Sequence, residues 1–380
     1  MTYLFTSEAV ANGHPDKICD QISDAIVDLH LRNDPNAHTA IETLSTTNRV
    51  IIAGETLSTA GVSTEMINDA IRNVIKNIGY EQAGFDWRKV EITNLLHRQS
   101  ANIADGIQDF GAGDQGIMFG YAKREFGFET EFMPLTVYLA NKLLMDLKNA
   151  QIDGLLPDAK SQITVEYDNK GRAVAVKKIV LSTQHREDMS LDSVREIVRD
   201  FIIKNIPSEL EPEKAQMMIN PAGKFVIGGP DGDAGLTGRK IVVDTYGGAA
   251  PHGGGAFSGK DPSKVDRSAA YMLRWLAKNI VAADLADECL LQVSYAIGKA
   301  EPLSLFIDCK GTEKTDKNKI YDFIGKNIDL TPKGIIKTLQ LKQPIYLPTA
   351  AYGHFGRQWD EEGHFSWEKT NLAKDLHQCK

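Results

Sequence analysis

The chain has 380 residues, of which 42% are hydrophobic and 25% are charged, and its formal net charge at pH 7 is −8. This composition is typical of a globular protein of two or three domains, and no apolar run reaches the ~20 residues that a membrane-spanning helix needs. The acidic balance argues against nonspecific nucleic-acid binding, because such binding depends on a basic surface that neutralises phosphates.

Helical and strand patterns alternate in the first part of the chain. Four apolar residues follow helical spacing after a polar turn: Ile18, Ile22, Ile26 and Leu29. Residues 50–53 predict a strand, and residues 66–78 predict a second helix that ends at Gly79. Further along, residues 134–148 and 190–205 are expected to be helices.

Later segments add more strands. Residues 160–183 are expected to form a hairpin around a turn at 168–171. Further strands are expected at residues 225–227, 241–246, 291–297 and 303–308, with a long helix over 266–286. Hairpins and single helices join most of these strands, and no regular run of βαβ units is visible. The expected fold class is therefore α+β rather than a doubly wound parallel sheet.

One region departs from average composition, since 12 of the 37 residues from Gly223 to Gly259 are glycine. Glycine makes up about 7% of ordinary sequence, and at high density it costs backbone entropy. A globular chain tolerates such density best where its backbone must approach a ligand. Tight turns and a flexible linker are the alternatives, and the apolar residues 241–243 argue against a linker.

Residues 13–17, Gly-His-Pro-Asp-Lys, lie between a polar loop and the first helix. An aspartate in the first helical turn, such as Asp16, can hold Mg²⁺ through one carboxylate oxygen. A neighbouring histidine, such as His14, can donate a hydrogen bond to a leaving oxygen. The alternative is an N-capping turn without chemistry.

Residues 254–260 match the pattern GxxxxGK, but the Ser or Thr that a phosphate-binding P-loop needs does not follow. The next turn alternates basic and acidic side chains: Lys260, Asp261, Lys264, Asp266 and Arg267. Lysines neutralise phosphate oxygens and aspartates hold bridging Mg²⁺, so this alternation suits a polyphosphate. A solvated helix start with local ion pairs is the alternative.

Residues 228–240 place two glycine-rich turns before a basic pair, Arg239 and Lys240. Such turns can point backbone N–H groups at an anion, while the basic pair supplies charge. Asp233 is a candidate partner for an ammonium or hydroxyl group. Lys160, at the expected start of a strand, would be an ordinary surface lysine if taken alone.

The cysteines show no CxxC pair and no metal-site spacing: Cys19, Cys289, Cys309 and Cys379. We expect reduced thiols and a cytoplasmic protein. The first ten residues carry neither a cationic segment nor a long apolar one, so no secretory signal is expected.

Together these segments resemble one family, the S-adenosylmethionine synthetases (methionine adenosyltransferases). The matching segments run through the chain in order: residues 5–8, 13–17, 111–116, 157–162, 225–230, 238–240, 244–247, 252–268 and 349–357. The 17-residue segment from His252 is highly specific by itself. The resemblance implies three similar α/β-sheet domains around a pseudo-threefold axis, the S-adenosylmethionine synthetase fold.

The implied domains are an N-terminal domain at 1–100, a lid and connecting segment at 101–116, a central domain at 117–230 and a C-terminal domain at 231–380, with spatial interlacing allowed. The implied reaction is attack of the methionine sulfur on C5′ of ATP. It releases tripolyphosphate, which is hydrolysed to pyrophosphate and phosphate. Two Mg²⁺ per site and K⁺ are the implied cofactors. The implied partners are ATP, L-methionine and further copies of the chain, in a dimer or dimer of dimers with sites at the subunit interface.

The resemblance also implies roles for individual residues. The catalytic residues are His14, which stabilises the departing O5′ side of the triphosphate, with Lys160, Arg239, Lys240, Lys260 and Lys264. The ATP contacts are His14, Asp158, Lys160, Phe225, Asp233, Arg239, Lys240, Ala256 and Lys260. The methionine contacts are Glu55, Gln99, Asp233 and Lys264. The metal ligands are Asp16 and Asp266 for Mg²⁺ and Glu42 for K⁺.

Two segments depart from the family's pattern. Residues 99–110 are shorter than its usual lid, which we expect to affect methionine more than ATP, and the acidic insertion at 359–363 is expected to be a surface loop. A P-loop-like kinase or ATPase is the rival enzyme, which ADP as a product would support. A non-catalytic ATP-binding subunit is the other rival. It would be expected to lose charged site residues that this chain retains.

Overall fold

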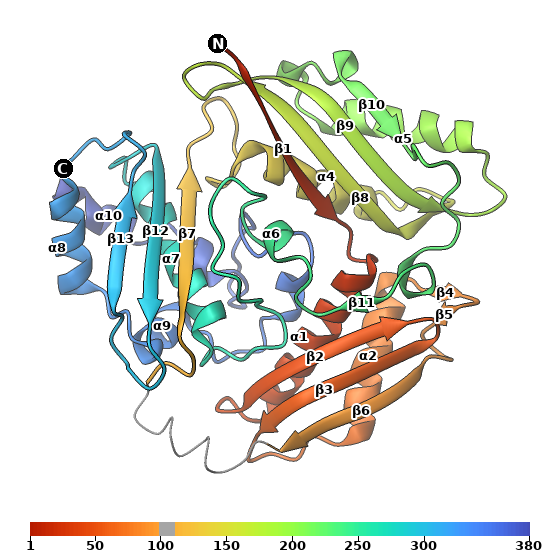
Figure 1. The fold of residues 1–380 in the computed structure, drawn as a ribbon, viewed down its shortest axis with the longest axis horizontal. Coiled ribbons are helices and arrows are strands. Elements are labelled where there is room, and N and C mark those ends of the chain that lie inside the picture. The colour runs from red at the N-terminus through yellow and green to blue at the C-terminus, as the bar shows by residue number, and fades with distance from the viewer. Residues whose placement is uncertain (99–110) are drawn as a thin grey trace.

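The computed structural model describes residues 1–98 and 111–380. Three main sheets lie around the middle of the molecule, and most of the helices lie behind them in the view of Figure 1. The expectation of an α+β fold built from three sheet-and-helix units is thereby confirmed. Among the described residues, no helix is both long and apolar enough to cross a membrane.

The first sheet has the strand order β11-β2-β3-β6, with β2 at His38–Thr46, β3 at Arg49–Leu57, β6 at Glu91–Arg98 and β11 at Gly235–Leu236. β2 and β3 form an antiparallel hairpin, whereas β6 runs parallel to β3 after a crossover through α2 (Thr64–Ile78). The helices α1 (Pro15–Asn33) and α2 lie behind this sheet (Figure 1). Its other face is left open.

Both of these helices begin where the sequence provides a cap, and α2 also ends at one. His14 caps α1, since its Nδ1 accepts a hydrogen bond from Asp16 N at 3.2 Å, and Pro15 lies in the first turn, where a backbone donor is not needed. Ser63 caps α2, and Gly79 ends it in the left-handed conformation at φ 105°. The predicted helices are confirmed at both places.

The second sheet has the order β1-β8-β9-β10, with β1 at Tyr3–Val10, β8 at Leu155–Tyr167, β9 at Ala173–His185 and β10 at Gln216–Ile219. β8 and β9 are the expected hairpin, and both are longer than the pattern predicted. Asp168 stabilises the turn by accepting the N–H groups of Lys170 and Arg172 at 2.8 and 3.0 Å. α4 (Leu135–Asn149) and α5 (Leu191–Asn205) share a buried core with this sheet.

The third sheet has the order β13-β12-β7, with β7 at Gly116–Lys123, β12 at Glu288–Tyr295 and β13 at Ser304–Asp308. The long predicted helix is confirmed as α7 (Val265–Ala282), which packs on this sheet. The smaller elements are β4 (Glu81–Gln82), β5 (Phe85–Asp86), α8 (Lys317–Asn327), α9 (Pro332–Leu339), α10 (Ala373–Leu376) and 3₁₀ turns at Ser208–Leu210, Pro212–Lys214, Gly229–Asp231, Leu347–Ala350, Ser366–Glu368 and His377–Cys379.

Each main sheet takes one strand from a distant part of the chain. β1 pairs with β8, β11 with β2, and β7 with β12, all antiparallel. The chain therefore crosses repeatedly between the sheets, and several of these crossings meet near α1 and α6 in the middle of the molecule (Figure 1). Several of the candidate site residues lie on these crossings, among them Asp233, Arg239 and Lys240.

The strand predicted at residues 241–246 is wrong. Ile241–Asp244 is instead the short helix α6, closed by a hydrogen bond from Asp244 N to Lys240 O at 2.8 Å. Three consecutive apolar residues are too few for periodicity to distinguish a strand from a helix.

The strand predicted at residues 225–227 is also wrong, since this segment lies outside every strand. His185, the last residue of β9, donates its backbone N–H to Phe225 O at 2.9 Å, and its ring atom Nε2 accepts the N–H of Phe225 at 3.1 Å. The imidazole therefore takes the place of a backbone carbonyl, and no strand ladder continues.

The remaining expectations for the surface and the thiols agree with the structure. All four cysteines are buried and free. Residues 359–362 of the acidic insertion are exposed, and Asp360 pairs with His364 at 2.7 Å. The insertion is thus the surface loop that was expected.

Candidate active site

The loop before α1 is pressed against β8. A side chain at Gly13 would bring its Cβ within 2.4 Å of the carbonyl oxygen of Pro157, so only glycine allows this approach. Tyr80 donates its hydroxyl to Gly13 O at 2.6 Å and fixes the loop from the other side. His14 and Asp16, at the start of α1, are thereby brought towards the strand that carries Lys160.

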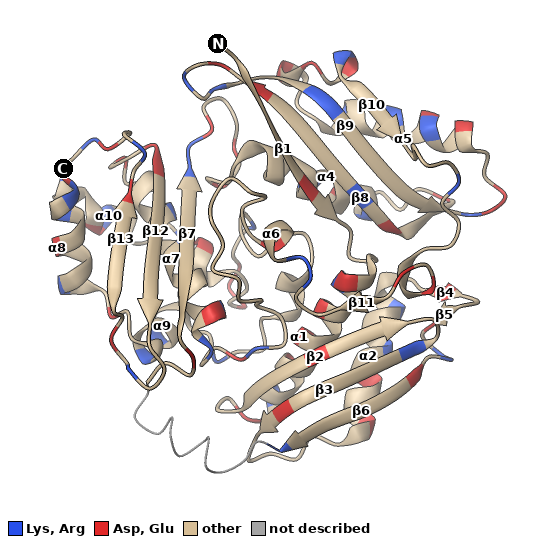
Figure 2. Cartoon of the chain, viewed as in Figure 1, with Lys and Arg blue, Asp and Glu red and all other residues tan. Residues whose placement is uncertain are grey.

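Asp16 lies buried among basic side chains. Lys240 Nζ is 2.5 Å from Asp16 Oδ2, Arg239 is 3.7 Å from Oδ1, and the backbone N–H of Leu236 donates to Oδ1 at 3.0 Å. Burial alone would raise the pKa of Asp16, but the Lys240 and Leu236 hydrogen bonds outweigh it and lower the pKa. Figure 2 shows the acidic start of α1 close to the basic segment before α6.

His14 is neutral in this setting. Burial, followed by the positive charge of Lys240, lowers its pKa to about 3. Because Nδ1 accepts the N–H of Asp16, the neutral ring carries its proton on Nε2. His14 is therefore a hydrogen-bond donor without a charge at neutral pH.

Asp158 and Lys160 both lie on β8 near this loop. Asp158 Oδ2 accepts the N–H of Gly229 at 2.8 Å. Burial raises the pKa of Asp158 to about 6, an effect that Lys160 opposes and Asp233 reinforces. Lys160 lies inside β8 rather than at its start, exposed and directly opposite Val10.

These contacts define a first cluster, which lies around the start of α1: His14, Asp16, Asp158, Lys160, Asp233, Arg239 and Lys240. Phe225 is tied to the end of β9 through His185, next to the segment that carries Gly229. The first cluster thus holds most of the residues that were expected to contact ATP.

A second group of charged residues surrounds the start of α7. Lys260 Nζ is 2.6 Å from Asp266 Oδ2, and Lys264 pairs with Asp261. Asp261 is buried and also accepts the N–H of Thr39 at 2.7 Å. The alternating lysines and aspartates therefore form local ion pairs, which was the alternative interpretation of this segment.

Glu55 and Glu42 lie beside this second group, on the open face of the first sheet. Ala40 of β2 faces Glu55 of β3 in the ladder and also bridges to Lys260. Glu42 lies two residues further along β2 on the same face; desolvation raises its pKa, and Lys260 opposes this shift. The second cluster is Glu42, Glu55, Lys260, Lys264 and Asp266.

In the described part of the chain, no hydrogen bond or ion pair joins a side chain of the first cluster to Lys260, Lys264 or Asp266. The turn at Gly238, next to Arg239, does approach the loop before Lys260, since a Cβ at Gly238 would lie 2.7 Å from the Cβ of Ala256. Gln99 and the expected lid at 99–110 lie outside the described residues. The predicted site residues therefore gather in two clusters rather than one.

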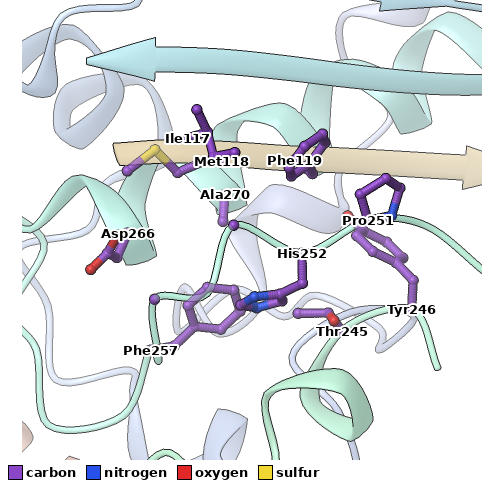
Figure 3. Close-up of a pocket in the computed structure, with 12 residues that line it drawn as sticks. Ile117, Met118, Phe119, Thr245, Tyr246, Pro251, His252, Phe257, Asp266 and Ala270 are labelled. Carbon is purple, nitrogen blue, oxygen red and sulfur yellow. The ribbon is translucent and has the colours of Figure 1, made fainter. Parts of the chain in front are cut away.

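Sequence reasoning missed His252, although it begins the 252–268 segment. Figure 3 shows His252 and Phe257 on a loop beside Asp266, around a hollow next to β7. Burial lowers the pKa of His252, and the charge of Asp266 opposes this. A Cβ at Gly255 would lie 2.3 Å from Asp266 Cγ, so this loop sets the position of the carboxylate.

Sequence reasoning also missed buried charges behind both clusters. Lys17 lies between Asp20 and Asp244 and pairs with both. Asp24 pairs with Arg267, and all four oxygen and nitrogen atoms involved are inaccessible to solvent. The signal that could have revealed them is the recurrence of aspartate every four residues along α1.

Chemically, the first cluster suits a polyanion. Lys160, Arg239 and Lys240 surround the N-terminus of a 19-residue helix, where unpaired backbone N–H groups already favour negative charge. A neutral donor at His14 adds a hydrogen bond without a further charge. The second cluster adds two more cations, Lys260 and Lys264, and three carboxylates on the same chain.

Comparison with known proteins agrees with this chemistry. Three family models match in order: the S-adenosylmethionine synthetase N-terminal domain at residues 2–101, central domain at 109–225 and C-terminal domain at 227–369. S-adenosylmethionine synthase 2 of Rhodopseudomonas palustris is 55% identical over 99% of this chain and 98% of its own. The S-adenosylmethionine synthases of Parvibaculum lavamentivorans and Maricaulis maris are each 53% identical, over 98% and 99% of this chain and 97% and 98% of theirs.

Proposed function

The chain belongs to the S-adenosylmethionine synthetase family, and we propose that it makes S-adenosylmethionine from ATP and L-methionine. The observation that carries the proposal is the first cluster, where a neutral His14 and three cations surround the start of α1. We assign the reaction to the cytoplasm, where the four free cysteines stay reduced.

In the proposed reaction, a lone pair on the methionine sulfur forms a bond to C5′ while the bond from C5′ to O5′ breaks. The products are the sulfonium S-adenosylmethionine and tripolyphosphate, which keeps the electron pair of the broken bond. A neutral thioether needs no general base. The barrier therefore lies in the leaving group, whose negative charge grows as the bond breaks.

His14 and the cations act on that leaving group. The Nε2–H of His14 donates a hydrogen bond to O5′ as it departs. The proton stays on Nε2 throughout, because a neutral imidazole is a much weaker acid than an imidazolium. Lys160, Arg239 and Lys240 bind the phosphate oxygens, together with Lys260 and Lys264 from the second cluster. The bound tripolyphosphate is then hydrolysed to pyrophosphate and phosphate.

The remaining candidates orient the substrates. Asp158 and Phe225 contact the adenosine, and Asp233 contacts both substrates. Glu55 binds the ammonium group of methionine, and Lys264 binds the carboxylate group of methionine. Holding sulfur, carbon and oxygen in line supplies much of the rate, since aligned reactants avoid the entropy of encounter.

Two Mg²⁺ ions and K⁺ are the proposed cofactors. Within residues 1–98 and 111–380, no three His, Cys, Asp or Glu side chains gather into a metal site. Asp16 and Asp266 each offer one carboxylate beside a lysine, a donor set that fits Mg²⁺ taking its other ligands from phosphates and water. Glu42 is the proposed K⁺ carboxylate. When bound, these ions would neutralise charge on the triphosphate.

We further propose that each active site is shared by two copies of the chain, in a dimer or a dimer of dimers. The separation of the two clusters supports this arrangement, since one copy could supply the first cluster and its partner the second. Leu44 and Leu95 on the open face of the first sheet, and Ile117 and Phe306 on the third sheet, are apolar residues between 37% and 56% exposed that a partner could cover. We call these two surfaces the open sheet faces.

Purified full-length protein incubated with ATP, L-methionine, Mg²⁺ and K⁺ tests the proposed reaction. Stoichiometric S-adenosylmethionine, pyrophosphate and phosphate are expected. ADP as the nucleotide product would instead support a kinase or ATPase. Tight ATP binding without any turnover would support a non-catalytic subunit.

A further inference from the structure

Four buried aspartates recur every four residues on one face of α1: Asp16, Asp20, Asp24 and Asp28. Each accepts backbone N–H groups from a segment distant in sequence: Leu236 for Asp16, Gly238 for Asp20, Gly259 for Asp24, and Tyr346 and Leu347 for Asp28. One helix face therefore holds the loops of both clusters. Asp24 binds the loop that carries Lys260 of the second cluster.

Asp24 forms a bidentate pair with Arg267 of α7. Arg267 NH1 donates to Oδ1 and NH2 to Oδ2, both at 2.7 Å, and both side chains have no exposed surface. Oδ1 also accepts the N–H of Gly259 at 2.9 Å. The carboxylate thus binds the guanidinium and the loop before Lys260 at the same time.

Arg267 binds the same loop one residue further along the chain. Its NH1 donates to the carbonyl oxygen of Lys260 at 3.0 Å, while Asp24 holds the N–H of the preceding Gly259. Gly259 has φ 83°, and a Cβ there would lie 2.0 Å from Ile41 O. The backbone of this segment is therefore fixed on three sides.

Every N–H donor of the Arg267 guanidinium group has a hydrogen-bond acceptor. Nε donates to Tyr271 at 3.0 Å, NH1 to Asp24 and the Lys260 carbonyl, and NH2 to Asp24 and Thr349 at 3.1 Å. These five acceptors match the five N–H donors of arginine. A lysine at this position offers three donors from one atom and cannot reproduce the fork.

We propose that Asp24 and Arg267 are positioning residues for the adenosyl transfer, which hold the Lys260 backbone so that its ammonium group stands beside Asp266. Neither residue touches substrate. The inference rests on the proposed role of Lys260 in binding the phosphates. If so, removing the paired hydrogen bonds of the Arg267 guanidinium weakens phosphate binding because Lys260 is displaced, and not because the whole protein is less stable.

The chain offers a matched control on the same helix. Arg274, also without exposed surface, forms a bidentate pair with Glu368 at 2.9 Å through Nε and NH2. It also donates to backbone carbonyls, among them Tyr121 O at 2.8 Å. None of its partners belongs to either cluster. Arg274→Lys therefore disturbs an equivalent buried pair away from the site.

The experiment compares Arg267→Lys and Arg274→Lys, each alone and combined with Lys260→Ala. Thermal unfolding reports stability, and titration calorimetry reports the Kd of the full-length protein for tripolyphosphate with Mg²⁺. In the wild-type background, Arg267→Lys is expected to raise this Kd on the order of tenfold. In the Lys260→Ala background, the same change is expected to raise it less than about threefold, since the effects of coupled residues are not additive. Arg274→Lys is expected to lower the Tm by about as much as Arg267→Lys does, and to leave the Kd for tripolyphosphate within about twofold of the wild-type value.

Should Arg267→Lys fail to fold, Asp24→Asn replaces it, because the amide oxygen still accepts the N–H of Gly259. The inference would be overturned if Arg267→Lys raised the Kd for tripolyphosphate by the same factor with Lys260 present and with Lys260→Ala. It would also be overturned if Arg274→Lys raised this Kd as much as Arg267→Lys. A normal Kd for Lys260→Ala alone would overturn the proposed role of Lys260 itself, which is a different result.

Discussion

Asp16 and Lys240 are separated by 224 residues in sequence, yet Lys240 Nζ lies 2.5 Å from Asp16 Oδ2. The contact joins the start of α1 to the glycine-rich segment before α6. It also occupies a carboxylate oxygen proposed for Mg²⁺, so the proposed function requires Lys240 to exchange Asp16 for a phosphate oxygen when ATP binds.

Lys260 and Asp266 are expected to affect the rate far more than the fold. Lys260→Ala and Asp266→Asn should each lower kcat by about 10²–10³-fold, because one preorganised charge partner contributes about 2–4 kcal/mol of transition-state stabilisation. Their side chains are 24% and 19% exposed, so the Tm should change little. Lys142→Ala, which removes a similar ion pair with Asp146, is the control and should keep its activity. Normal turnover in a folded Lys260 or Asp266 variant would remove that residue from the site.

His14 should remain neutral well below the usual pKa of histidine. The unfolded chain takes up a proton at His14 below about pH 6.5, whereas the folded chain does so only near its pKa of about 3. Stability is therefore lost progressively as pH falls through this window. In ¹⁵N-NMR of the imidazole, the Nε2–H tautomer should persist at pH 5. An imidazole that titrates near pH 6.5 would contradict the neutral donor.

Gly255 should be intolerant of even a methyl group. Gly255→Ala brings a Cβ to 2.3 Å from Asp266 Cγ and must displace the carboxylate, so activity should fall as it does in Asp266→Asn. Gly325→Ala is the control, because no atom lies within 4 Å of its Cβ in α8. That change should stabilise the protein by about 0.5–1 kcal/mol and leave kcat unchanged. Full activity in Gly255→Ala would show that the position of Asp266 is not critical.

The open sheet faces should mediate association. Leu95→Glu and Phe306→Glu place charges on these faces, so the variants should sediment as smaller species and lose activity more steeply on dilution. Met66→Glu, on the helix α2 behind the first sheet, is the matched control and should behave as the wild type. Unchanged sedimentation for both sheet variants would exclude these faces as the interface.

Local patterns predicted local structure well. The stripe of α1, the capped helix α2 and the turn at 168–171 were predicted because their signals are complete within a few residues. The segments 241–246 and 225–227 were predicted wrongly. The first has too few apolar residues to show a period, and the second is hydrogen-bonded by the histidine side chain at the end of β9.

Long-range pairing could not be predicted in the same way. Nothing in β1 specifies β8 as its partner, and β11 is only two residues long. The division of the candidate residues into two clusters follows from this pairing rather than from their spacing. Lys17 and Arg267 illustrate the point, since their acidic partners Asp244 and Asp24 lie 227 and 243 residues away.

Complementation between two inactive variants tests the shared site most directly. Lys240→Ala disables the first cluster and Lys260→Ala disables the second. If each site combines clusters from two copies, random assembly after co-expression gives about half mixed dimers, each with one intact site. Activity should then recover to about a quarter of the wild-type value. Co-expression of Lys240→Ala with Arg239→Ala, which both lie in the first cluster, should stay inactive. Activity no higher than that of the separate variants would contradict a site built from two copies.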